Sequence, residues 1–326
     1  MKRILTGLQP TGTITLGNYI GAIKQMVERQ DEFDSYIFVA DLHSITIPQD
    51  KNELSERTKS LIALYLACGI DKDKNTIFLQ SQNPYHANLS WLLECNTYFG
   101  ELSRMIQFKE KSHGHENFSV GLFTYPVLMA SDILLYDTNY VPVGIDQKQH
   151  VEITRDIAIR FNKKYGEVFT IPEPLISKEG TKIMDLVDPN KKMSKSSENK
   201  KGVISLLDDL ASIRKKIMGA TTDSDMVIKY DPENKPGISN LLNIYVSLTG
   251  KTMNESEKEF EGMNYGQFKS IVADAVCDTI LKIQERYNEI INSNIIDEVL
   301  LKGKEKTIKE AQEKFELAKT SMGFYK

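Results

Sequence analysis

The stretch TGLQPTGTITLGNYIGA, residues 6–22, sets the architecture of the N-terminal half, because it joins a short apolar strand to a long helical pattern. Its glycines let the backbone approach a ligand closely, and its threonines and Asn18 put polar groups where a helix begins. The free N–H groups at such a helix N-terminus favour a phosphate. The spacing matches neither GxGxxG nor GxxxxGKS, so the usual dinucleotide and P-loop mechanics do not apply. The alternative is a glycine-rich turn that Asn18 caps.

Beyond this stretch, short apolar runs alternate with longer helical patterns over the first two thirds of the chain. Strands are predicted at residues 4–7, 36–40, 76–80, 140–143 and 181–186. Helices are predicted at residues 16–29, 53–69, 86–100 and 146–166. The alternation predicts the α/β class, with a doubly wound, parallel, Rossmann-like sheet that has helices on both faces. Ligands of such sheets bind beyond the carboxyl ends of the strands, so the loops there are candidate sites.

A change of pattern after about residue 203 indicates a second, helical domain. Apolar residues three and four apart predict successive amphipathic helices at 204–220, 238–250, 265–291 and 307–322. With 326 residues, the chain is long enough for two domains. The expected division is therefore a Rossmann-like nucleotide-binding domain at 1–203 and an α-helical domain at 204–326.

The composition is that of an ordinary globular protein, with 40% apolar and 26% charged residues. The net charge of −4 argues against a protein that coats DNA or RNA non-specifically. Three well-separated cysteines without a CxxC pair argue against a disulfide framework or a structural zinc site. The first apolar stretch is too short for a signal peptide, and no run approaches the ~20 residues of a membrane span. We therefore expect a cytoplasmic protein that binds neither DNA nor a membrane.

Two further loops border predicted strands and helices. In YVPVGIDQKQH, residues 140–150, Gly144 and Asp146 lie between a strand and a helix, a position suited to ribose hydroxyls. Asp146 could equally be only the N-cap of that helix. In VDPNKKMSKSSENKKG, residues 187–202, lysines and serines are crowded together with almost nothing apolar. By itself this run is typical of a solvated loop.

A carboxylate also lies on an apolar helix face. In LFTYPVLMASDILLYDT, residues 122–138, helical spacing puts Met129, Asp132, Ile133 and Tyr136 on one side. Burying an aspartate there is costly unless its carboxylate accepts hydrogen bonds, so Asp132 is a candidate binding residue. The alternative is that Ser131 or Asp132 merely caps a helix.

These loops together resemble the signatures of the class I aminoacyl-tRNA synthetases, in particular those of their bacterial tryptophan-specific branch. Lys192–Ser196 spell the second signature of that family, KMSKS, and QPTGTITLGN, residues 9–18, is similar to the first. Four longer segments match the same branch in its order and spacing, at residues 105–112, 134–162, 183–196 and 235–245. The resemblance covers essentially the whole chain.

The resemblance implies ATP-dependent activation of L-tryptophan, with Mg²⁺, to tryptophanyl-adenylate, followed by transfer to tRNA(Trp). This activation needs no protein nucleophile, only positioning and stabilisation of negative charge on the phosphates. The catalytic residues that it implies are Lys192, Lys195, Thr15 and Asn18. The ATP-binding residues that it implies are Gln9, Pro10, Thr11, Gly17, Asn18, Gly144, Ile145, Asp146, Ile183, Lys192, Met193, Ser194, Lys195 and Ser196. No protein ligand for a metal ion is implied.

The tryptophan pocket that the resemblance implies is built around Asp132. The indole N–H of tryptophan only donates, so a carboxylate in an otherwise apolar pocket recognises it well. Tyr125 and Gln147 would lie near the ammonium group of the amino acid. The residues implied to line the indole are His43, Leu5, Gly7, Ala40, Met129, Ile133, Val141 and Val143. His43 could equally be a hydrogen-bonded histidine at a strand end.

The resemblance also implies a homodimer, formed through an insertion at roughly residues 104–175, and a C-terminal domain that reads the tRNA anticodon. The basic cluster of Arg214, Lys215 and Lys216 would suit RNA, although solvated charge explains it as well. Two other functions stay open: a tyrosine-specific synthetase, and a synthetase-like RNA-binding protein without catalysis. Asn18 and the VPVGIDQKQH segment argue against the first, and the intact lysines of KMSKS argue against the second.

Overall fold

The described part of the chain contains a five-stranded sheet whose strands all run parallel. The computed structural model describes residues 1–112, 118–176, 182–194, 197 and 199–325. The strand order is β3-β2-β1-β4-β5. The strands are β1 (Arg3–Leu8), β2 (Asp34–Val39), β3 (Asn75–Leu79), β4 (Tyr140–Val143) and β5 (Glu173–Ile176). The predicted α/β class with a Rossmann-like parallel sheet is confirmed, as are the first four strands.

The strand predicted at 181–186 is wrong. Thr181 lies outside the described residues, and the rest of that segment forms only an isolated antiparallel bridge between Met184 and Lys192. The fifth strand is β5, whose sequence EPLI contains Pro174. A proline removes a backbone donor and weakens the strand pattern, but an edge strand tolerates it because one side has no neighbouring strand. β5 lies at the edge of the sheet.

Helices connect the strands in the alternation that the sequence predicts. They are α1 (Leu16–Asn18), α2 (Lys24–Glu28), α3 (Asp41–Ser44), α4 (Glu53–Ala67), α5 (Tyr85–Glu94), α6 (Phe99–Leu102), α7 (Ile106–Ser112), α8 (Val120–Leu134) and α9 (Lys148–Tyr165). The π-helix η1 (Tyr19–Ile23) joins α1 to α2, while η2 (Gln80–Gln82) and η3 (Ile145–Gln147) are 3₁₀ turns. The helix predicted at 86–100 is two helices, because Asn96 and Thr97 bond back to the last carbonyls of α5 and end it.

The two faces of the sheet are covered by two separate clusters of buried side chains. On β2, Ile37 and Val39 join the cluster that contains α4, while Tyr36 and Phe38 join the cluster that contains α5, α8 and α9. This alternation follows from the period of two along a strand. Helices therefore cover both faces, which confirms the doubly wound arrangement.

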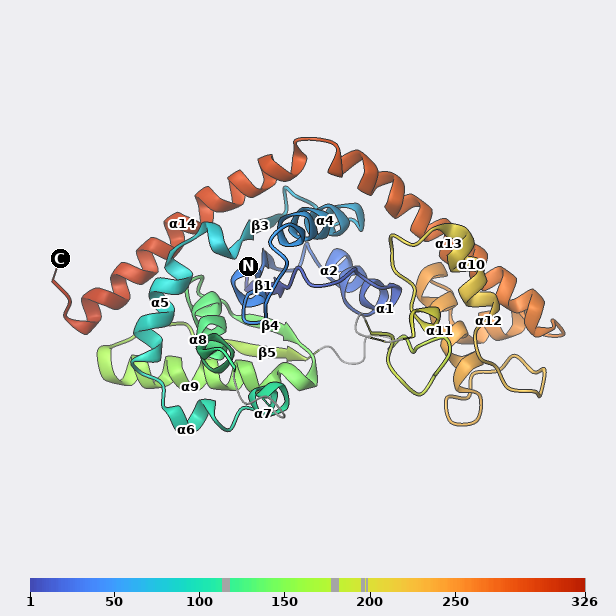
Figure 1. The fold of residues 1–326 in the computed structure, drawn as a ribbon, viewed down its shortest axis with the longest axis horizontal. Coiled ribbons are helices and arrows are strands. Elements are labelled where there is room, and N and C mark those ends of the chain that lie inside the picture. Colours follow the sequence, from blue (N-terminus) through green and yellow to red (C-terminus); the bar gives the residue numbers. More distant parts are fainter. Residues whose placement is uncertain (113–117, 177–181, 195–196, 198, 326) are drawn as a thin grey trace.

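The rest of the chain is helical, as predicted. The turn η4 (Lys200–Gly202) precedes α10 (Leu210–Met218), α11 (Pro236–Thr249), α12 (Met253–Glu259), α13 (Tyr265–Ile291) and α14 (Ile295–Met322). Helices α10, α11 and α13 pack together and share a buried cluster with α4. Figure 1 shows α10–α13 gathered at one end of the molecule, in yellow and orange. No helix in the described ranges is both long enough and apolar enough to cross a membrane.

Helix α13 leads from this end towards α4, and α14 continues from there along the sheet, past β3 and α5 (Figure 1). Gly303 permits the close approach, because a Cβ there would lie 1.8 Å from the carbonyl oxygen of Ile77. Two turns further on, Glu310 accepts hydrogen bonds from Arg3 and Tyr36 of the sheet. The part of the chain predicted to form the helical domain thus also contacts the sheet, and the segment 104–175 supplies β4. The division at residue 203 and the role of that segment stay predictions.

Candidate active site

A pocket lies where the direction of the strand order reverses. β1 lies between β2 and β4, and ligands of parallel sheets bind at such a switch point, beyond the carboxyl ends of the strands. The pocket has a volume of ≈ 570 Å³. Its lining residues are Leu5, Thr6, Gly7, Gln9, Phe38, Ala40, His43, Thr46, Gln107, Glu110, Tyr125, Met129, Asp132, Ile133, Val141, Pro142, Val143, Gly144 and Gln147.

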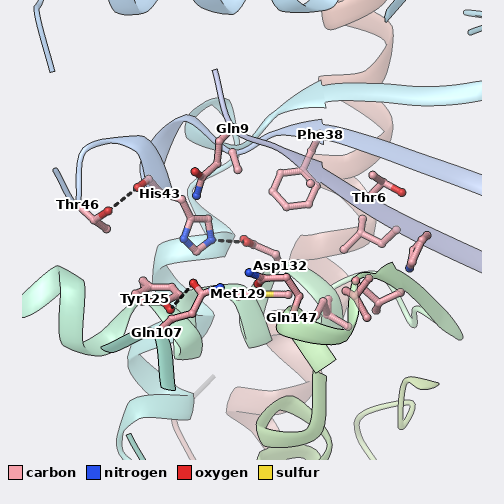
Figure 2. Close-up of a pocket in the computed structure, with 18 of the residues that line it drawn as sticks. Thr6, Gln9, Phe38, His43, Thr46, Gln107, Tyr125, Met129, Asp132 and Gln147 are labelled. Carbon is pink, nitrogen blue, oxygen red and sulfur yellow. Dashed lines mark hydrogen bonds and ion pairs between the residues drawn. The ribbon is translucent and has the colours of Figure 1, made fainter. Parts of the chain in front are cut away.

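Every residue expected to bind tryptophan lines this one pocket. The residues come from β1, β4, α8, the turn η3 after β4, and Ala40 and α3 after β2. Figure 2 shows Tyr125, Met129 and Gln147 on one side of the pocket and Gln9 and Phe38 on the other. The structure therefore brings the expected residues together, while their roles toward an amino acid stay predictions.

The carboxylate of Asp132 forms part of the pocket wall and is held by three side chains. His43 Nε2 lies 2.9 Å from Oδ2, whereas His86 Nδ1 and Gln80 Nε2 lie 2.7 and 2.8 Å from Oδ1. Figure 2 shows the ring of His43 directed at this carboxylate. The N-cap of α8 is Ser119, at the far end of the helix, so the interpretation of Asp132 as a helix cap is wrong. Asp132 is instead a buried acceptor, only 1% exposed.

The hydrogen bonds keep this carboxylate ionised. Burial raises the pKa of Asp132, but the bonds from His43 and His86 outweigh burial, and the net effect lowers the pKa from its usual value. An ionised carboxylate only accepts hydrogen bonds and has about four lone-pair positions. Among the described residues, two donors reach Oδ1 and one reaches Oδ2, which leaves a position at Oδ2 for a donor from a ligand.

Tyr125 packs against His43 at the same wall. The two rings meet edge-on, with centroids 6.2 Å apart, and this contact helps to fix the orientation of His43 toward Asp132. The Tyr125 hydroxyl lies 2.8 Å from His150 Nε2 and 3.3 Å from Gln107 Oε1. Burial raises the pKa of Tyr125 to about 12, so its hydroxyl stays protonated at neutral pH. His43 is thus both a hydrogen-bonded histidine after a strand and a pocket-lining residue.

The segment after β1 is the capped start of a helix. Thr15 is the cap: its Oγ1 accepts the Asn18 N–H at 3.1 Å, and its own N–H donates to Asn18 Oδ1 at 3.1 Å. Asn18 is therefore the reciprocal partner rather than the capping residue. A Cβ on Gly17 would lie 3.4 Å from the Cβ of Met193 and 3.6 Å from that of Ile183. Expected nucleotide-binding residues from two distant segments meet at this helix start.

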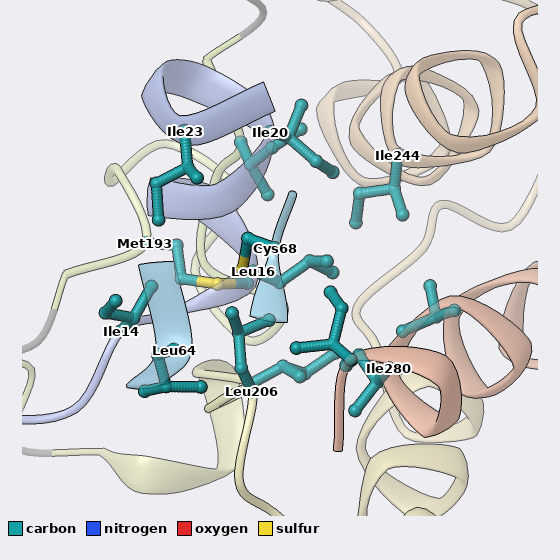
Figure 3. Close-up of a cluster of buried hydrophobic side chains, with 14 of the residues drawn as sticks. Ile14, Leu16, Ile20, Ile23, Leu64, Cys68, Met193, Leu206, Ile244 and Ile280 are labelled. Carbon is teal, nitrogen blue, oxygen red and sulfur yellow. The ribbon is translucent and has the colours of Figure 1, made fainter. Parts of the chain in front are cut away.

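The KMSKS segment is anchored by its second residue. The Met193 N–H donates to the carbonyl of Ile183 at 3.0 Å, and the neighbouring Lys192 pairs with Met184. The Met193 side chain is 1% exposed and lies in the same buried cluster as Leu16 (Figure 3). A wholly solvated loop therefore does not describe this run, although Lys192 itself is exposed. Of the other residues of the signature, Ser194 is half-buried, and Lys195 and Ser196 lie outside the described residues.

The loops after β1 and β4 meet at the pocket, since Gln9 and Gly144 both line it. Gln147, not Asp146, is the N-cap of α9, so the interpretation of Asp146 as that cap is wrong. The other expected ATP-binding residues in these loops lie within two residues of Gln9 or Gly144 along the chain, namely Pro10, Thr11, Ile145 and Asp146.

Two partners of Asp132 are not predicted from the sequence, namely Gln80 and His86. Gln80 had a signal, because a polar residue directly after β3 lies at the same edge of the sheet as the other candidate loops. His86 lies in α5 and has none, because its contact with Asp132 depends on how α5 packs on α8. The pocket-lining residues that are not predicted are Thr6, Phe38, Thr46, Gln107, Glu110 and Pro142.

Comparison with known proteins now decides the family. The family model described as tRNA synthetases class I (W and Y) matches residues 1–281. The chain belongs to this family. The chain is 53% identical, over 322 residues, to the tryptophan–tRNA ligase of Halalkalibacterium halodurans. This match covers 99% of this chain and 98% of that protein. It is 51% identical to the tryptophan–tRNA ligase of Bacillus subtilis, with coverage of 99% and 98%.

Solved structures of the same family superpose on the synthetase along its whole length. The tryptophanyl-tRNA synthetase from Mycoplasma pneumoniae gives a TM-score of 0.88 at 38% identity, covering 100% of this chain and 98% of that chain. The enzyme from Campylobacter jejuni, complexed with ADP and tryptophan, gives 0.87 at 36% identity, with coverage of 99% and 100%. The resemblance to the tryptophan branch of the class I synthetases is thereby confirmed.

Proposed function

We propose that this synthetase activates tryptophan with ATP in the pocket between β1 and β4 and then transfers it to tRNA. The observation that supports this most directly is Asp132, a buried and ionised acceptor in the wall of a pocket at the switch point. In addition, about half of the residues of the chain, over its whole length, are identical to those of tryptophan–tRNA ligases. The chain is thus an enzyme, a ligase of class I.

On the amino-acid side, the indole N–H would donate to Asp132 Oδ2. An amino acid without this donor leaves a buried charge unpaired, which costs binding free energy and gives the pocket its selectivity. Met129, Ile133 and Val141 would contact the indole ring with apolar side chains. Tyr125 would lie near the ammonium group of the amino acid.

On the nucleotide side, the tryptophan carboxylate would attack the α-phosphorus of ATP, and pyrophosphate would leave with the electron pair of the broken P–O bond. Gly17 offers backbone without a side chain at the start of a helix, where N–H groups favour a phosphate. Thr15 orders Asn18 through their reciprocal hydrogen bonds. Lys192 would neutralise the leaving pyrophosphate, together with Lys195. Mg²⁺ is part of the proposal as a counter-ion of the phosphates.

Exchange of labelled pyrophosphate into ATP tests this function. The purified full chain should support exchange that depends on added tryptophan, and it should charge tRNA with tryptophan when tRNA is supplied. Omission of tryptophan is the control and should abolish exchange. No tryptophan-dependent exchange would overturn the proposal, and charging would separate a complete synthetase from one that performs activation alone.

We also propose that the synthetase is a homodimer that pairs through an apolar surface on α5–α8. The rings of Phe99, Phe123, Phe108 and Phe118 contact one another in a row, with centroids 4.9, 5.0 and 5.2 Å apart along it. Phe99 is 74% exposed, and Trp91 is also exposed on the neighbouring helix α5. An exposed apolar patch of this kind is typical of a protein–protein interface.

Light scattering would test the dimer. The measured mass should be twice the 37.1 kDa of one chain. Phe99→Glu places a charge in the patch and should shift the mass to that of a single chain. Leu301→Glu, on the exposed surface of α14, is the control and should leave the mass unchanged. A single-chain mass for the unmodified protein would contradict the homodimer.

The helical part, residues 204–326, is the part that we propose contacts the anticodon of tRNA. Its basic cluster is partly engaged within the chain, since Arg214 pairs with Asp274 and Lys216 with Asp208. The proposal therefore rests mainly on the family. Lys215→Glu should lower the rate of tRNA charging and leave pyrophosphate exchange unchanged; equal loss of both would contradict an RNA-contacting role. We place the enzyme in the cytoplasm, where tRNA is charged.

A further inference from the structure

Behind the pocket, a buried chain of polar side chains leads away from Asp132. His86 Nδ1 lies 2.7 Å from Asp132 Oδ1, and His86 Nε2 lies 2.8 Å from the hydroxyl of Tyr136. Asn83 Nδ2 donates to the same hydroxyl at 3.0 Å and to the carbonyl of Thr307, in α14, at 3.2 Å. His86 is 0% exposed and does not line the pocket, so among the described residues its hydrogen-bonded route to a bound ligand runs through Asp132.

The carboxylate of Asp132 decides which nitrogen of His86 donates to it. The ionised carboxylate of Asp132 only accepts, so Nδ1 of His86 must carry the hydrogen between them. The other ring nitrogen, Nε2, meets the hydroxyl of Tyr136, which also accepts a hydrogen bond from Asn83 Nδ2.

The ring of His86 is also held in place by its neighbours. It lies against the rings of Phe38 and Phe78, with centroids 6.1 and 6.0 Å away. The hydroxyl of Ser131 donates to the backbone carbonyl of His86 at 2.6 Å. A donor whose ring is held by its neighbours fixes the position of the acceptor that it binds.

This arrangement divides the two oxygens of Asp132 between the core and the pocket. Oδ1 takes its donors from Gln80 and His86, both 0% exposed and neither in the pocket lining. Oδ2 takes its donor from His43, which does line the pocket. The oxygen on the pocket side is therefore the one positioned to accept from a ligand.

We propose that His86 is a positioning residue for amino-acid selection: it holds Asp132 by Oδ1 so that Oδ2 faces the ligand as an acceptor. The inference rests on the proposed function and names what enforces its selectivity. The class of ligand that this device selects is an aromatic amino acid with a ring N–H donor. A ligand of the same shape without that donor gains nothing from it.

Binding of tryptophan and of a sulfur isostere tests the proposal. In the isostere, the ring N–H is replaced by sulfur, so the shape is kept and the donor is lost. The dissociation constant of the isostere divided by that of tryptophan, both measured by titration calorimetry on the full chain, isolates the contribution of the donor. His86→Leu removes the Nδ1 donor and should lower this ratio roughly tenfold, mainly because tryptophan binds more weakly. His86→Asn keeps an N–H near the Nδ1 position and should restore most of the ratio.

Two further variants keep the test decisive where His86→Leu folds poorly. Tyr136→Phe leaves His86 in place and removes the hydroxyl that holds its ring at Nε2, so the ratio should fall by a smaller factor. In an Asp132→Asn background, His86→Leu should no longer change the ratio, because its route to the ligand is gone.

The outcomes separate the proposal from its rivals. If His86→Leu weakened the binding of both ligands equally, or if it still lowered the ratio in the Asp132→Asn background, His86 would have a structural role and the positioning role would be overturned. An unchanged ratio in both His86→Leu and Tyr136→Phe would overturn it as well. Failure of the unmodified chain to bind tryptophan would instead overturn the proposed function.

Discussion

Asn240 holds the peptide groups on both sides of Met184 with its side-chain amide. Its Oδ1 accepts the Met184 N–H at 2.8 Å, and its Nδ2 donates to the Met184 carbonyl at 2.9 Å. Asn240 belongs to α11, whereas Met184 follows Ile183 and pairs with Lys192. A residue of the helical part thus fixes the backbone between two of the residues expected to bind ATP.

Asn240→Ala should therefore impair ATP use more than tryptophan use. Loss of the two hydrogen bonds leaves partly buried backbone groups unpaired and should lower the free energy of unfolding by about 1–3 kcal/mol. The KM for ATP in pyrophosphate exchange should rise roughly tenfold, while that for tryptophan changes little. Asn243→Ala, one turn further along α11, is the control. Equal increases in both KM values would contradict a specific role at the nucleotide.

Asp132→Asn should weaken discrimination against phenylalanine and tyrosine. An amide has one acceptor oxygen, so it cannot accept from His43, His86 and Gln80 as the carboxylate does, and one donor is left facing an N–H group. Loss of a charged hydrogen bond should lower kcat/KM for tryptophan by roughly 10- to 100-fold. Steady-state exchange with the three amino acids measures this. Unchanged kcat/KM for all three would exclude the proposed role of Asp132.

The lowered pKa of Asp132 predicts a pH dependence of stability. Because the carboxyl group has a lower pKa in the folded chain than its ordinary value of 3.8, the unfolded chain binds the proton more tightly. The stabilisation is therefore present above pH 3.8 and is lost as the pH falls through the folded-state pKa below it. The gap in unfolding free energy between the unmodified chain and Asp132→Asn, from urea denaturation, should narrow as the pH is lowered past that value. A gap that widens on acidification would contradict the sign of the shift.

Lys192→Ala should lower kcat for activation more than it changes the KM for tryptophan. A cation that meets the leaving pyrophosphate acts mainly in the transition state, where loss of one such group costs about 10²–10³ in kcat. Lys191→Ala is the matched control, since Lys191 is exposed and paired with Asp188. A fall in kcat that is equal for the two variants would place the effect in the general charge of the loop.

Gly303→Ala should separate α14 from the sheet. The added methyl would overlap the carbonyl oxygen of Ile77, which is backbone and cannot move aside. Overpacking of this kind costs about 1–3 kcal/mol or more, measured by chemical denaturation. Glu305→Ala, on the exposed side of the same helix, should cost well under that amount. Equal stability of the two variants would argue that α14 does not pack as closely as described.

Some of the fold and site follows from local sequence, and some of it cannot. Strands β1 to β4 are apolar runs bounded by turns, and the candidate loops follow them, so their meeting point could be predicted. β5 could not, because Pro174 disrupts the pattern in a strand that only an edge position permits. The contact of His86 with Asp132 could not either, because it joins residues 46 positions apart through the packing of two helices.

Likewise, no local pattern shows that Met193 faces the core while Lys192 faces solvent. Both lie in one polar run, and only the pairing with Ile183 and Met184 separates them. Thr15 shows the same limit at a smaller scale. Its hydroxyl could have been a capping group or a free donor, and the reciprocal hydrogen bonds with Asn18 decide that it caps.

The central claim is that the pocket around Asp132 selects tryptophan, and pyrophosphate exchange with each of the twenty amino acids separately tests it most directly. Tryptophan alone should support rapid exchange, with phenylalanine and tyrosine slower by at least 10- to 100-fold, the factor expected of one charged hydrogen bond. Rapid exchange with tyrosine and none with tryptophan would contradict the account, because the carboxylate would then be reading a phenol.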